Sequence, residues 1–130
     1  AGKEAARLLE DVGLPGDYAE KYPHELSGGE CQRAAIARAM SVHPEILICD
    51  EATSALDVSA QAKIVELLVH LCRIHNVSIL FITHDLPLVS NISDRILIMN
   101  EGELVEEGST EEVITRPKTV YTRRLLDAVC

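Results

Sequence analysis

The chain has 130 residues, of which 47% are hydrophobic and 25% are charged, and its formal net charge is −9 at pH 7. A chain of this length can bury one substantial core, and this composition is typical of an α/β module. The acidic balance argues against nucleic acid as the main partner, and no apolar run is long enough to span a membrane.

The first third of the chain predicts two helices with a break between them. Residues Lys3–Val12 are expected to form a helix that ends at Gly13–Gly16, a cluster of glycine and proline. A second helix is expected over about Gly28–Ser41, because it must stop before Pro44.

The start of the second helix contains two adjacent glycines. Ser27 and Glu30 have the spacing of a capping box, in which each side chain accepts a hydrogen bond from a backbone N–H of the first turn. A cap does not explain Gly28 and Gly29, since each glycine within a helix costs about 0.5–1 kcal/mol relative to alanine. Without side chains, the N–H groups at this positive helix end can approach an anion closely. The stretch predicts either a helix cap alone or a phosphate site.

Two short apolar segments end in acidic and imidazole side chains. Ile46–Cys49 runs into Asp50 and Glu51, and Ser78–Thr83 runs into His84–Asp85. A strand that is apolar on both faces is expected in the middle of a covered parallel sheet, where ligands gather at the carboxyl ends of the strands. Adjacent carboxylates at such an end are expected to share a cation or a proton. The alternative is a strand end that simply meets solvent.

The other elements expected in the second half of the chain are a helix over Ala60–His75, a short helix near Leu86–Ser90, a hairpin of Arg95–Met99 and Glu103–Glu106 around Asn100–Gly102, a helix from a capping box at Ser109 and Glu112 to Pro117, and a last helix from about Thr119. The first of these helices places Ile64, Leu67, Leu68 and Leu71 on one stripe that can cover a sheet face. It therefore links the two strands by a parallel crossover.

Four cysteines, at positions 31, 49, 72 and 130, show no paired spacing of the zinc or redox kind. Cys49 lies in an apolar strand and Cys72 on the apolar side of a helix. We expect buried free thiols, and neither a metal site nor a disulfide.

In their order and spacing, these motifs resemble the ATP-binding cassette (ABC) family, specifically the C-terminal part of a transporter nucleotide-binding domain. Leu26–Glu30, followed by Cys31–Arg33, resembles the family signature motif, which is usually written LSGGQ. Ile46–Glu51 resembles the Walker B strand, Ser54–Asp57 the D-loop, and His84 the switch histidine.

Three further segments resemble the importer branch that transports oligopeptides, dipeptides or nickel. They are Tyr22–Glu25 before the signature, Asp57–Ala62 after the D-loop, and Tyr121–Leu126 near the end. The resemblance implies an ATP-binding subunit that couples ATP hydrolysis to the uptake of peptides or a related small solute.

The fold implied by the resemblance is α/β, part of a P-loop NTPase domain with parallel strands, covering helices and a terminal hairpin. Residues 1–42 are expected to belong to the helical signature subdomain, and residues 43–130 to the RecA-like core and C-terminal helices. No stretch reads Gly-x-x-x-x-Gly-Lys-Ser/Thr, the Walker A loop. We therefore expect the chain to be a portion of a cassette that is not competent for hydrolysis alone.

The resemblance also implies roles for single residues. Glu51 would be the general base, Asp50 would hold Mg²⁺ through its water shell, and His84 would contact the γ-phosphate of ATP. The signature residues Ser27–Glu30 would cover the ATP bound by a second cassette. Asp57 would couple the two sites at the dimer interface, although a helix N-cap is the alternative.

The implied cofactors are ATP and Mg²⁺, and the implied partners are a second cassette and transmembrane permease subunits. Location at the cytoplasmic face of the membrane, in contact with it only through those partners, follows from the same resemblance. Two other interpretations are an ATPase lobe of the SMC and Rad50 group, which adjoins long coiled coils that this chain does not have, and a non-catalytic interaction module.

Overall fold

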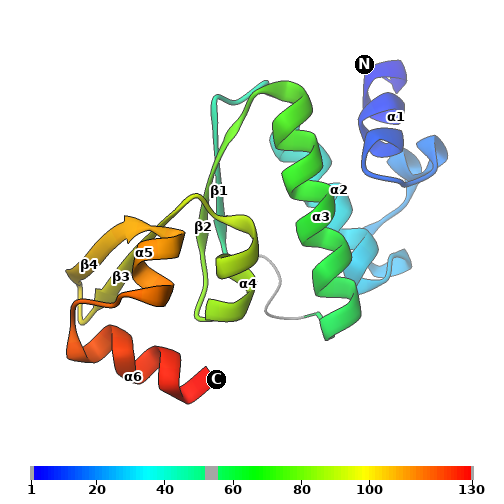
Figure 1. Cartoon of the computed structure of the whole chain (residues 1–130). Helices are drawn as coiled ribbons and strands as arrows, with labels where there is room; N and C mark the ends of the chain where they lie inside the picture. Colours follow the sequence, from blue (N-terminus) through cyan, green and yellow to red (C-terminus); the bar gives the residue numbers. More distant parts are fainter. Residues whose placement is uncertain (1, 52–55, 130) are drawn as a thin grey trace. The chain divides into compact units, whose positions relative to one another are not determined.

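The computed structural model describes residues 2–51 and 56–129, and the chain divides into two compact units, Ala1–Ile82 and Thr83–Cys130. The elements of the N-terminal unit are α1 (Gly2–Asp11), the 3-10 helices η1 (Gly16–Glu20) and η2 (Pro23–Glu25), α2 (Gly28–Met40), β1 (Ile46–Asp50), α3 (Val58–His75) and β2 (Ser78–Ile82) (Figure 1). The elements of the C-terminal unit are α4 (Leu86–Ile92), β3 (Arg95–Asn100), β4 (Glu103–Ser109), α5 (Thr110–Thr115) and α6 (Val120–Val129).

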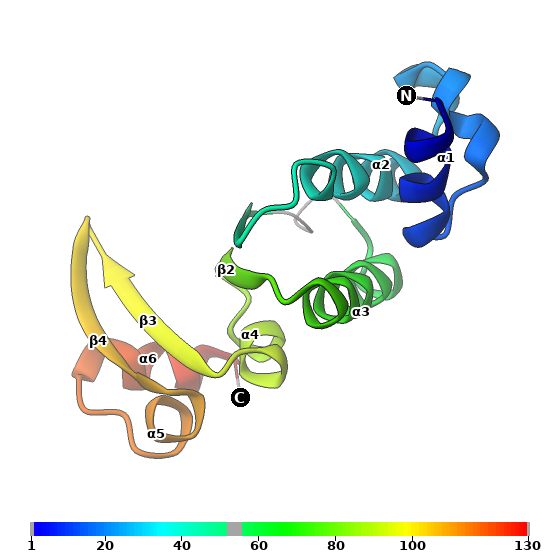
Figure 2. The same cartoon turned by 90° about the horizontal axis from the view of Figure 1, so that it is seen from above.

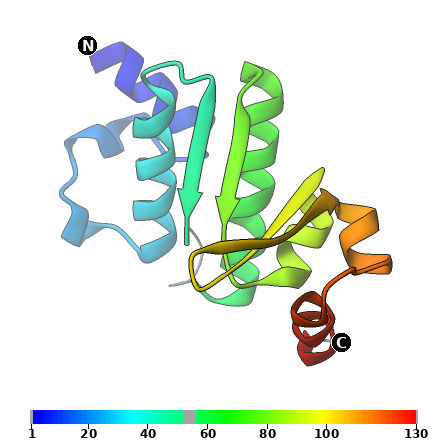
Figure 3. The ribbon, with the colours of Figure 1, turned by 90° about the vertical axis from the view of Figure 1, so that its left-hand side faces the viewer.

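Strands β1 and β2 pair in parallel, in a register that runs from Ile46 opposite Ser78 to Asp50 opposite Ile82 (Figure 3). Parallel strands cannot be joined by a tight turn, so the chain crosses between them through α3. The predicted strand, helix and parallel strand are confirmed.

The core of the N-terminal unit combines apolar side chains of α1, α2 and α3 with Leu47 and Cys49 of β1. Along α3 the predicted stripe is confirmed, with Ile64, Leu68 and Leu71 buried and Leu67 half-buried. The helix ends at Asn76, which adopts the left-handed conformation with φ 55° and so stops the helical hydrogen bonds.

The expectation that the first strand is buried on both faces is wrong for the described residues. β1 buries Leu47 and Cys49, but Ile46 and Ile48 remain 64% and 63% exposed. The amphipathic helices of this unit cover a single face of a two-stranded sheet, so the alternate side chains of β1 are left without cover. An apolar run shows that a strand can be covered on both faces, not that both covers are present.

Helix α1 ends one residue before the predicted position, in a turn that is locked to α2. The N–H of Leu14 donates to the carbonyl of Leu9 at 2.9 Å, and Gly13 adopts φ 78°. The Arg33 guanidinium, which belongs to α2, donates through Nη1 to the carbonyl of Val12 at 2.7 Å. A cation therefore caps the negative end of α1 and fixes α1 to α2.

In the C-terminal unit, β3 and β4 form the predicted antiparallel hairpin (Figure 2). Glu101 and Gly102 both have positive φ, 48° and 81°, as a two-residue turn of this kind requires. One face of the hairpin buries Ile96 and Ile98 against Val113 of α5.

The predicted helices of this unit are also present. Ser109 accepts a hydrogen bond from the N–H of Glu112 at 3.2 Å and so begins α5. The last helix begins at Val120, one residue later than expected. No helix within residues 2–51 and 56–129 is long and apolar enough to cross a bilayer.

Glu106 of β4 is a buried carboxylate, only 7% exposed, that the sequence did not indicate. It accepts hydrogen bonds from the N–H groups of Lys118 and Thr119, both at 2.9 Å, and from the Thr119 hydroxyl at 3.0 Å. Burial raises the pKa of Glu106, but these hydrogen bonds outweigh it and lower the pKa to about 2. The carboxylate thus holds the start of α6 against β4.

Replacing Glu106 by Ala is expected to lower the free energy of unfolding by about 1.5–3 kcal/mol at pH 7, because three donors lose a charged acceptor. The folded pKa of Glu106, about 2, lies below the ordinary value of 4.5, so its stabilisation is complete above pH 4.5 and is lost as the pH falls towards 2. Urea unfolding of both proteins should therefore show a difference that shrinks over this range. The neighbouring exposed Glu107→Ala is the control, and an equal deficit for Glu106→Ala at pH 7 and pH 2.5 would contradict the assignment.

Candidate functional site

The turn that begins α2 has the capping box expected from its sequence. Ser27 is the N-cap, and its Oγ accepts a hydrogen bond from the Glu30 N–H at 3.2 Å. In return, Glu30 Oε1 accepts one from the Ser27 N–H at 3.0 Å. This second bond is the main cause of the lowered pKa of Glu30. We call residues Ser27–Glu30 the signature turn.

The two glycines of the signature turn are not required by the fold. Neither has a positive φ, since among the described glycines only Gly13 and Gly102 do. A Cβ on Gly28 would meet Leu56 at an ordinary 3.8 Å, and one on Gly29 would meet no described atom within 4 Å. The helix cap explains Ser27 and Glu30, but it still leaves the glycines unexplained.

The backbone of Gly28 and Gly29 is open to a ligand. Their N–H groups have no hydrogen-bond acceptor among the described residues, since the first helical bond is that from Cys31 to the Ser27 carbonyl. Ser27 and Gly28 are exposed, and Gly29 is partly so. Two adjacent donors at the positive end of a 13-residue helix therefore face solvent without side chains in the way, an arrangement suited to a phosphate.

The carboxyl end of β1 places two acids side by side. Asp50 is the last residue of the strand, and Glu51 follows it with φ 52°, a left-handed conformation that residues other than glycine rarely adopt. The N–H of Glu51 still donates to the Ile82 carbonyl at 2.9 Å, so the backbone there is held by the end of β2. Strained backbone of this kind is concentrated at functional sites. Both carboxylates are exposed.

A magnesium ion fits Asp50 as one carboxylate ligand among waters. The described residues contain no group of three or more His, Cys, Asp and Glu side chains that could hold a metal ion. Mg²⁺ prefers one or two carboxylates and keeps several waters, so an exposed Asp50 at a strand end agrees with binding through the water shell. The metal role of Asp50 stays a prediction.

Asp57 is the N-cap of α3, as the alternative interpretation expected. Its Oδ1 accepts hydrogen bonds from the Ala60 N–H and the Ser59 hydroxyl, both at 2.8 Å. The bond from Ala60 is the main cause of the lowered pKa of Asp57. Of the predicted D-loop, Ser54 and Ala55 lie outside the described residues, and the coupling role of Asp57 stays a prediction.

His84 belongs to the C-terminal unit, where it is exposed just before α4. The residue after it, Asp85, is the N-cap of that helix and accepts a hydrogen bond from the Leu88 N–H at 3.0 Å. Asp85 thus caps α4, whereas contact between His84 and a phosphate stays a prediction.

The three cysteines within the described residues are free thiols, and Cys49 and Cys72 are buried as expected. Burial raises the pKa of Cys49 to about 11 and also raises that of Cys72. Neither thiol is a candidate nucleophile, because both are protonated at neutral pH.

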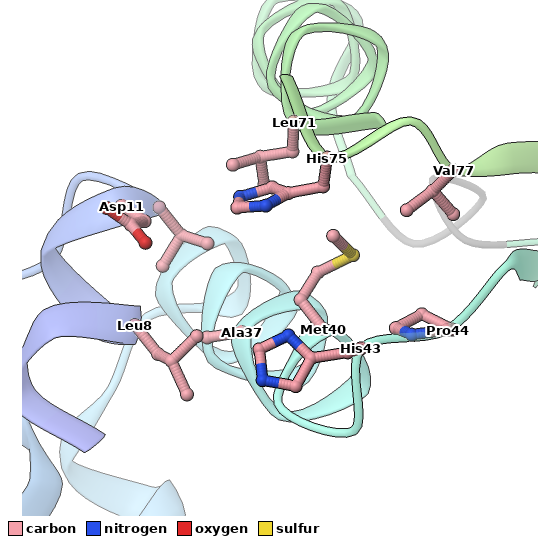
Figure 4. Close-up of a pocket in the computed structure, with 10 residues that line it drawn as sticks. Leu8, Asp11, Ala37, Met40, His43, Pro44, Leu71, His75 and Val77 are labelled. Atoms are coloured by element: carbon pink, nitrogen blue, oxygen red, sulfur yellow. The ribbon is translucent and has the colours of Figure 1, made fainter. Parts of the chain in front are cut away.

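A cavity of about 110 Å³ lies among the ends of α1, α2 and α3 (Figure 4). Its lining is largely apolar, with Asp11, His43 and His75 also bordering it. Pro44 and Val77 line it just before β1 and β2, so it lies at the amino ends of the strands. Ligands of open α/β sheets bind at the opposite, carboxyl ends, and none of the predicted site residues borders this cavity.

One feature near the signature turn was not predicted. The rings of Tyr22 and His24 are stacked, with centroids 5.8 Å apart and an angle of 11° between their planes. Tyr22 is 68% exposed. Only the spacing of two aromatic rings around Pro23 could have indicated this pair from the sequence.

A model of the ABC transporter family matches residues 1–54. Over 129 residues the chain is 48% identical to the glutathione import ATP-binding protein GsiA of Pectobacterium atrosepticum, and the match covers 99% of the chain and 21% of that protein. It is 52% identical over 122 residues to the oligopeptide transport ATP-binding protein OppF of Escherichia coli, covering 94% of the chain and 36% of that protein. The chain thus spans about a fifth and about a third of the length of these two relatives.

The fold is similar to the crystal structure of the ADP conformation of MJ1267, an ATP-binding cassette of an ABC transporter, with a TM-score of 0.79 at 25% identity. That match covers 94% of this chain and 49% of the other. Both of the sequence relatives named above are described as ATP-binding proteins of import or transport.

If the glycines of the signature turn serve a ligand and not the fold, Gly29→Ala should leave the free energy of unfolding unchanged or raise it by up to about 1 kcal/mol. Gly13→Ala is the matched control, because Gly13 has φ 78° and its Cβ would lie 3.0 Å from Arg33 Nη1. In the Gly13→Ala variant the free energy of unfolding should fall by about 1–2 kcal/mol. Urea unfolding of the parent and the two variants measures this free energy. A clear decrease for Gly29→Ala would show that Gly29 has a structural role.

Proposed function

We propose that this chain, which belongs to the ABC transporter family, provides the signature turn and the Walker B carboxylates of an ATPase. This ATPase drives the import of oligopeptides or a related small solute. The observation that carries this proposal is the pair of N–H groups at Gly28 and Gly29, which lie in an open turn and have no acceptor within residues 2–51 and 56–129. The solute class follows the relatives, whose names specify glutathione import and oligopeptide transport.

The signature turn binds the phosphates of ATP that is held by a second cassette. The Ser27 hydroxyl and the N–H groups of Gly28 and Gly29 donate hydrogen bonds to the negatively charged phosphates. All three donors lie at the positive end of one helix. The Glu30 carboxylate, held by the Ser27 N–H at 3.0 Å, keeps the turn in this conformation. Because the donors belong to one subunit and the nucleotide to the other, ATP joins the two cassettes.

Glu51 is the general base that orients and deprotonates the attacking water. Its backbone is fixed twice, by β1 before it and by the hydrogen bond to Ile82, so its carboxylate is carried by a rigid strand end. Asp50 would hold Mg²⁺ through its water shell, and the bound ion would supply positive charge that offsets the charge on the phosphates. Phosphoryl transfer depends mainly on such positioning and charge stabilisation.

His84 and Asp57 have supporting roles in this proposal. An imidazole can donate a hydrogen bond to a phosphoryl oxygen whether it is neutral or charged, so His84 can report the γ-phosphate. Asp57 couples the two sites at the dimer interface in addition to capping α3. The division into a signature subdomain, about residues 1–42, and a core portion is part of the same proposal.

The working assembly is two cassettes bound to transmembrane permease subunits at the cytoplasmic face of the membrane. ABC importer ATP-binding subunits in general dimerise and pair with permeases, and ABC ATPases in general bind ATP with Mg²⁺. A non-catalytic interaction module is the remaining alternative, and it predicts binding to a full-length cassette without any effect of Glu51 on activity.

In the full-length subunit that contains this chain, Glu51→Gln is expected to reduce ATP hydrolysis by about 100-fold or more, since it keeps the shape of the side chain and removes the base. ATP binding should persist, and the ATP-bound dimer should live longer. Steady-state hydrolysis and size-exclusion chromatography with ATP measure both effects. Glu45→Gln, at the other end of β1, is the control, and near wild-type hydrolysis by Glu51→Gln would remove Glu51 from this role.

Gly29→Asp tests the signature turn in the same full-length subunit. The substitution adds bulk and a negative charge where a phosphate is proposed to lie, and like charges in a closed site repel strongly. Dimerisation driven by ATP and hydrolysis should be largely lost. A helix cap alone predicts the opposite, because an acid in the first turn of a helix is neutral or mildly stabilising. Thermal stability, unchanged or slightly raised, separates lost binding from lost folding.

A further inference from the structure

The second half of α2 is anchored in the core, whereas the first half is not. The buried side chains of this helix, Ile36, Ala37 and Met40, all lie after its midpoint. None of residues 28–33 is buried, and this half of the helix begins with the two glycines of the signature turn. The orientation of the signature turn therefore depends on the contacts that hold the first half of α2.

Hydrogen bonds from the side chains of Arg33 and Cys31 attach the first half of α2 to the chain before it. Arg33 Nη1 donates to the Val12 carbonyl at 2.7 Å, and the Cys31 thiol donates to the Pro23 carbonyl at 3.5 Å. A thiol is a weak donor, whereas a hydrogen bond from a charged guanidinium is short and roughly twice as strong as a neutral one. Arg33 therefore provides the stronger of these two attachments.

The acceptor of the Arg33 hydrogen bond is a fixed point. Val12 is 1% exposed and Leu14 is 5% exposed, so the turn that follows α1 is anchored in the core on both sides of Gly13. The N–H of Leu14 donates to the Leu9 carbonyl at 2.9 Å and closes this turn. A guanidinium that donates to the Val12 carbonyl is thus held by the core of the N-terminal unit.

Gly13 leaves the space that the Arg33 guanidinium occupies. It adopts φ 78°, which residues other than glycine rarely do, and a Cβ at this position would lie 3.0 Å from Arg33 Nη1. A side chain at Gly13 would therefore displace either the turn or the guanidinium. Unlike Gly28 and Gly29, Gly13 is required both by its backbone conformation and by the contact with Arg33.

A small change in the direction of α2 is enough to move the donors of the signature turn. Gly28 lies about 12 Å along the helix axis from Ile36, so a tilt of about 5° around the buried half moves the Gly28 N–H by about 1 Å. Charge-assisted hydrogen bonds to an anion have a narrow range of length, about 2.7–2.9 Å. A contact that prevents such a tilt therefore determines whether these N–H groups reach a phosphate.

We propose that Arg33 is a positioning residue for the signature turn. Its hydrogen bond to Val12 holds the first half of α2 in the orientation at which the N–H groups of Gly28 and Gly29 meet the nucleotide of a second cassette. This proposal rests on the proposed function of the signature turn. It gives the contact between α1 and α2 a role in ATP hydrolysis in addition to its role in stability.

The test compares variants of the full-length subunit that contains this chain. Arg33→Gln removes the charged donor and should lower steady-state ATP hydrolysis about tenfold or more, since misplacing a group at a reacting site by about 1 Å can cost about 100-fold. The ATP concentration for the half-maximal rate should also rise. Arg33→Lys keeps a charged donor and should retain more activity than Arg33→Gln. Gly13→Ala disturbs the same contact from the other side and should also lower hydrolysis.

Two controls separate positioning from loss of charge and from loss of stability. Arg38→Gln removes the same charge from an exposed position of α2 and should hydrolyse ATP as the parent does. Ile64→Val removes a buried methylene from α3, lowers the melting temperature while keeping the Arg33 hydrogen bond, and should also hydrolyse ATP at the parent rate. Circular dichroism of each variant gives the melting temperature and confirms folding at the assay temperature.

Parent-like hydrolysis by folded Arg33→Gln would overturn the proposal. An equal loss in Ile64→Val would also overturn it, because stability alone would then explain both variants. Gly29→Asp tests the proposed function on which the proposal rests. If Gly29→Asp loses ATP-driven dimerisation and Arg33→Gln hydrolyses ATP normally, the turn binds phosphate and Arg33 has a structural role only. If Gly29→Asp dimerises and hydrolyses ATP normally, the proposed function of the turn fails, whatever the result for Arg33.

Discussion

The parallel pairing of β1 with β2 is the constraint on which the N-terminal unit depends. Parallel strands need a crossover, and here the crossover is the 18-residue helix α3, whose apolar stripe supplies the centre of the core. The same pairing makes the carboxyl ends of both strands coincide. The hydrogen bond from Glu51 to Ile82 continues the pairing beyond the strand and holds the proposed base in place.

The signature turn is stable and also open to a ligand, because some of its backbone N–H groups cap the helix and the others remain available for binding. The capping box uses the N–H groups of Ser27 and Glu30, which stabilises the helix end. The N–H groups of Gly28 and Gly29 between them are left for a ligand. The cation that caps α1, Arg33, comes from the same helix, so the turn is carried by two helices fixed to each other.

The C-terminal unit depends on a different interaction, the hydrogen bonds of the buried Glu106 carboxylate. It joins the hairpin to the segment before α6 by hydrogen bonds to Lys118 and Thr119. A buried carboxylate is costly unless it is well hydrogen-bonded, and the pKa of about 2 shows that here the bonds prevail over burial. The C-terminal unit is therefore stabilised by a polar contact as well as by its apolar cluster.

The sequence by itself determined the local features: the periodic stripe of α3, the capping box of Ser27 and Glu30, the N-cap of α5 at Ser109, the two-residue turn at Glu101 and Gly102, and the acids at the end of β1. These features depend on interactions between residues within a few positions of one another, so the sequence pattern is enough to predict them. The tertiary structure decided what depends on distant partners: the single covered face of β1, the contact of Glu106 with residues 12 and 13 positions away, and the open space at Gly29. Whether a glycine or an acid is structural or free for a ligand depends on which atoms surround it, and those atoms are brought together only by the folded chain.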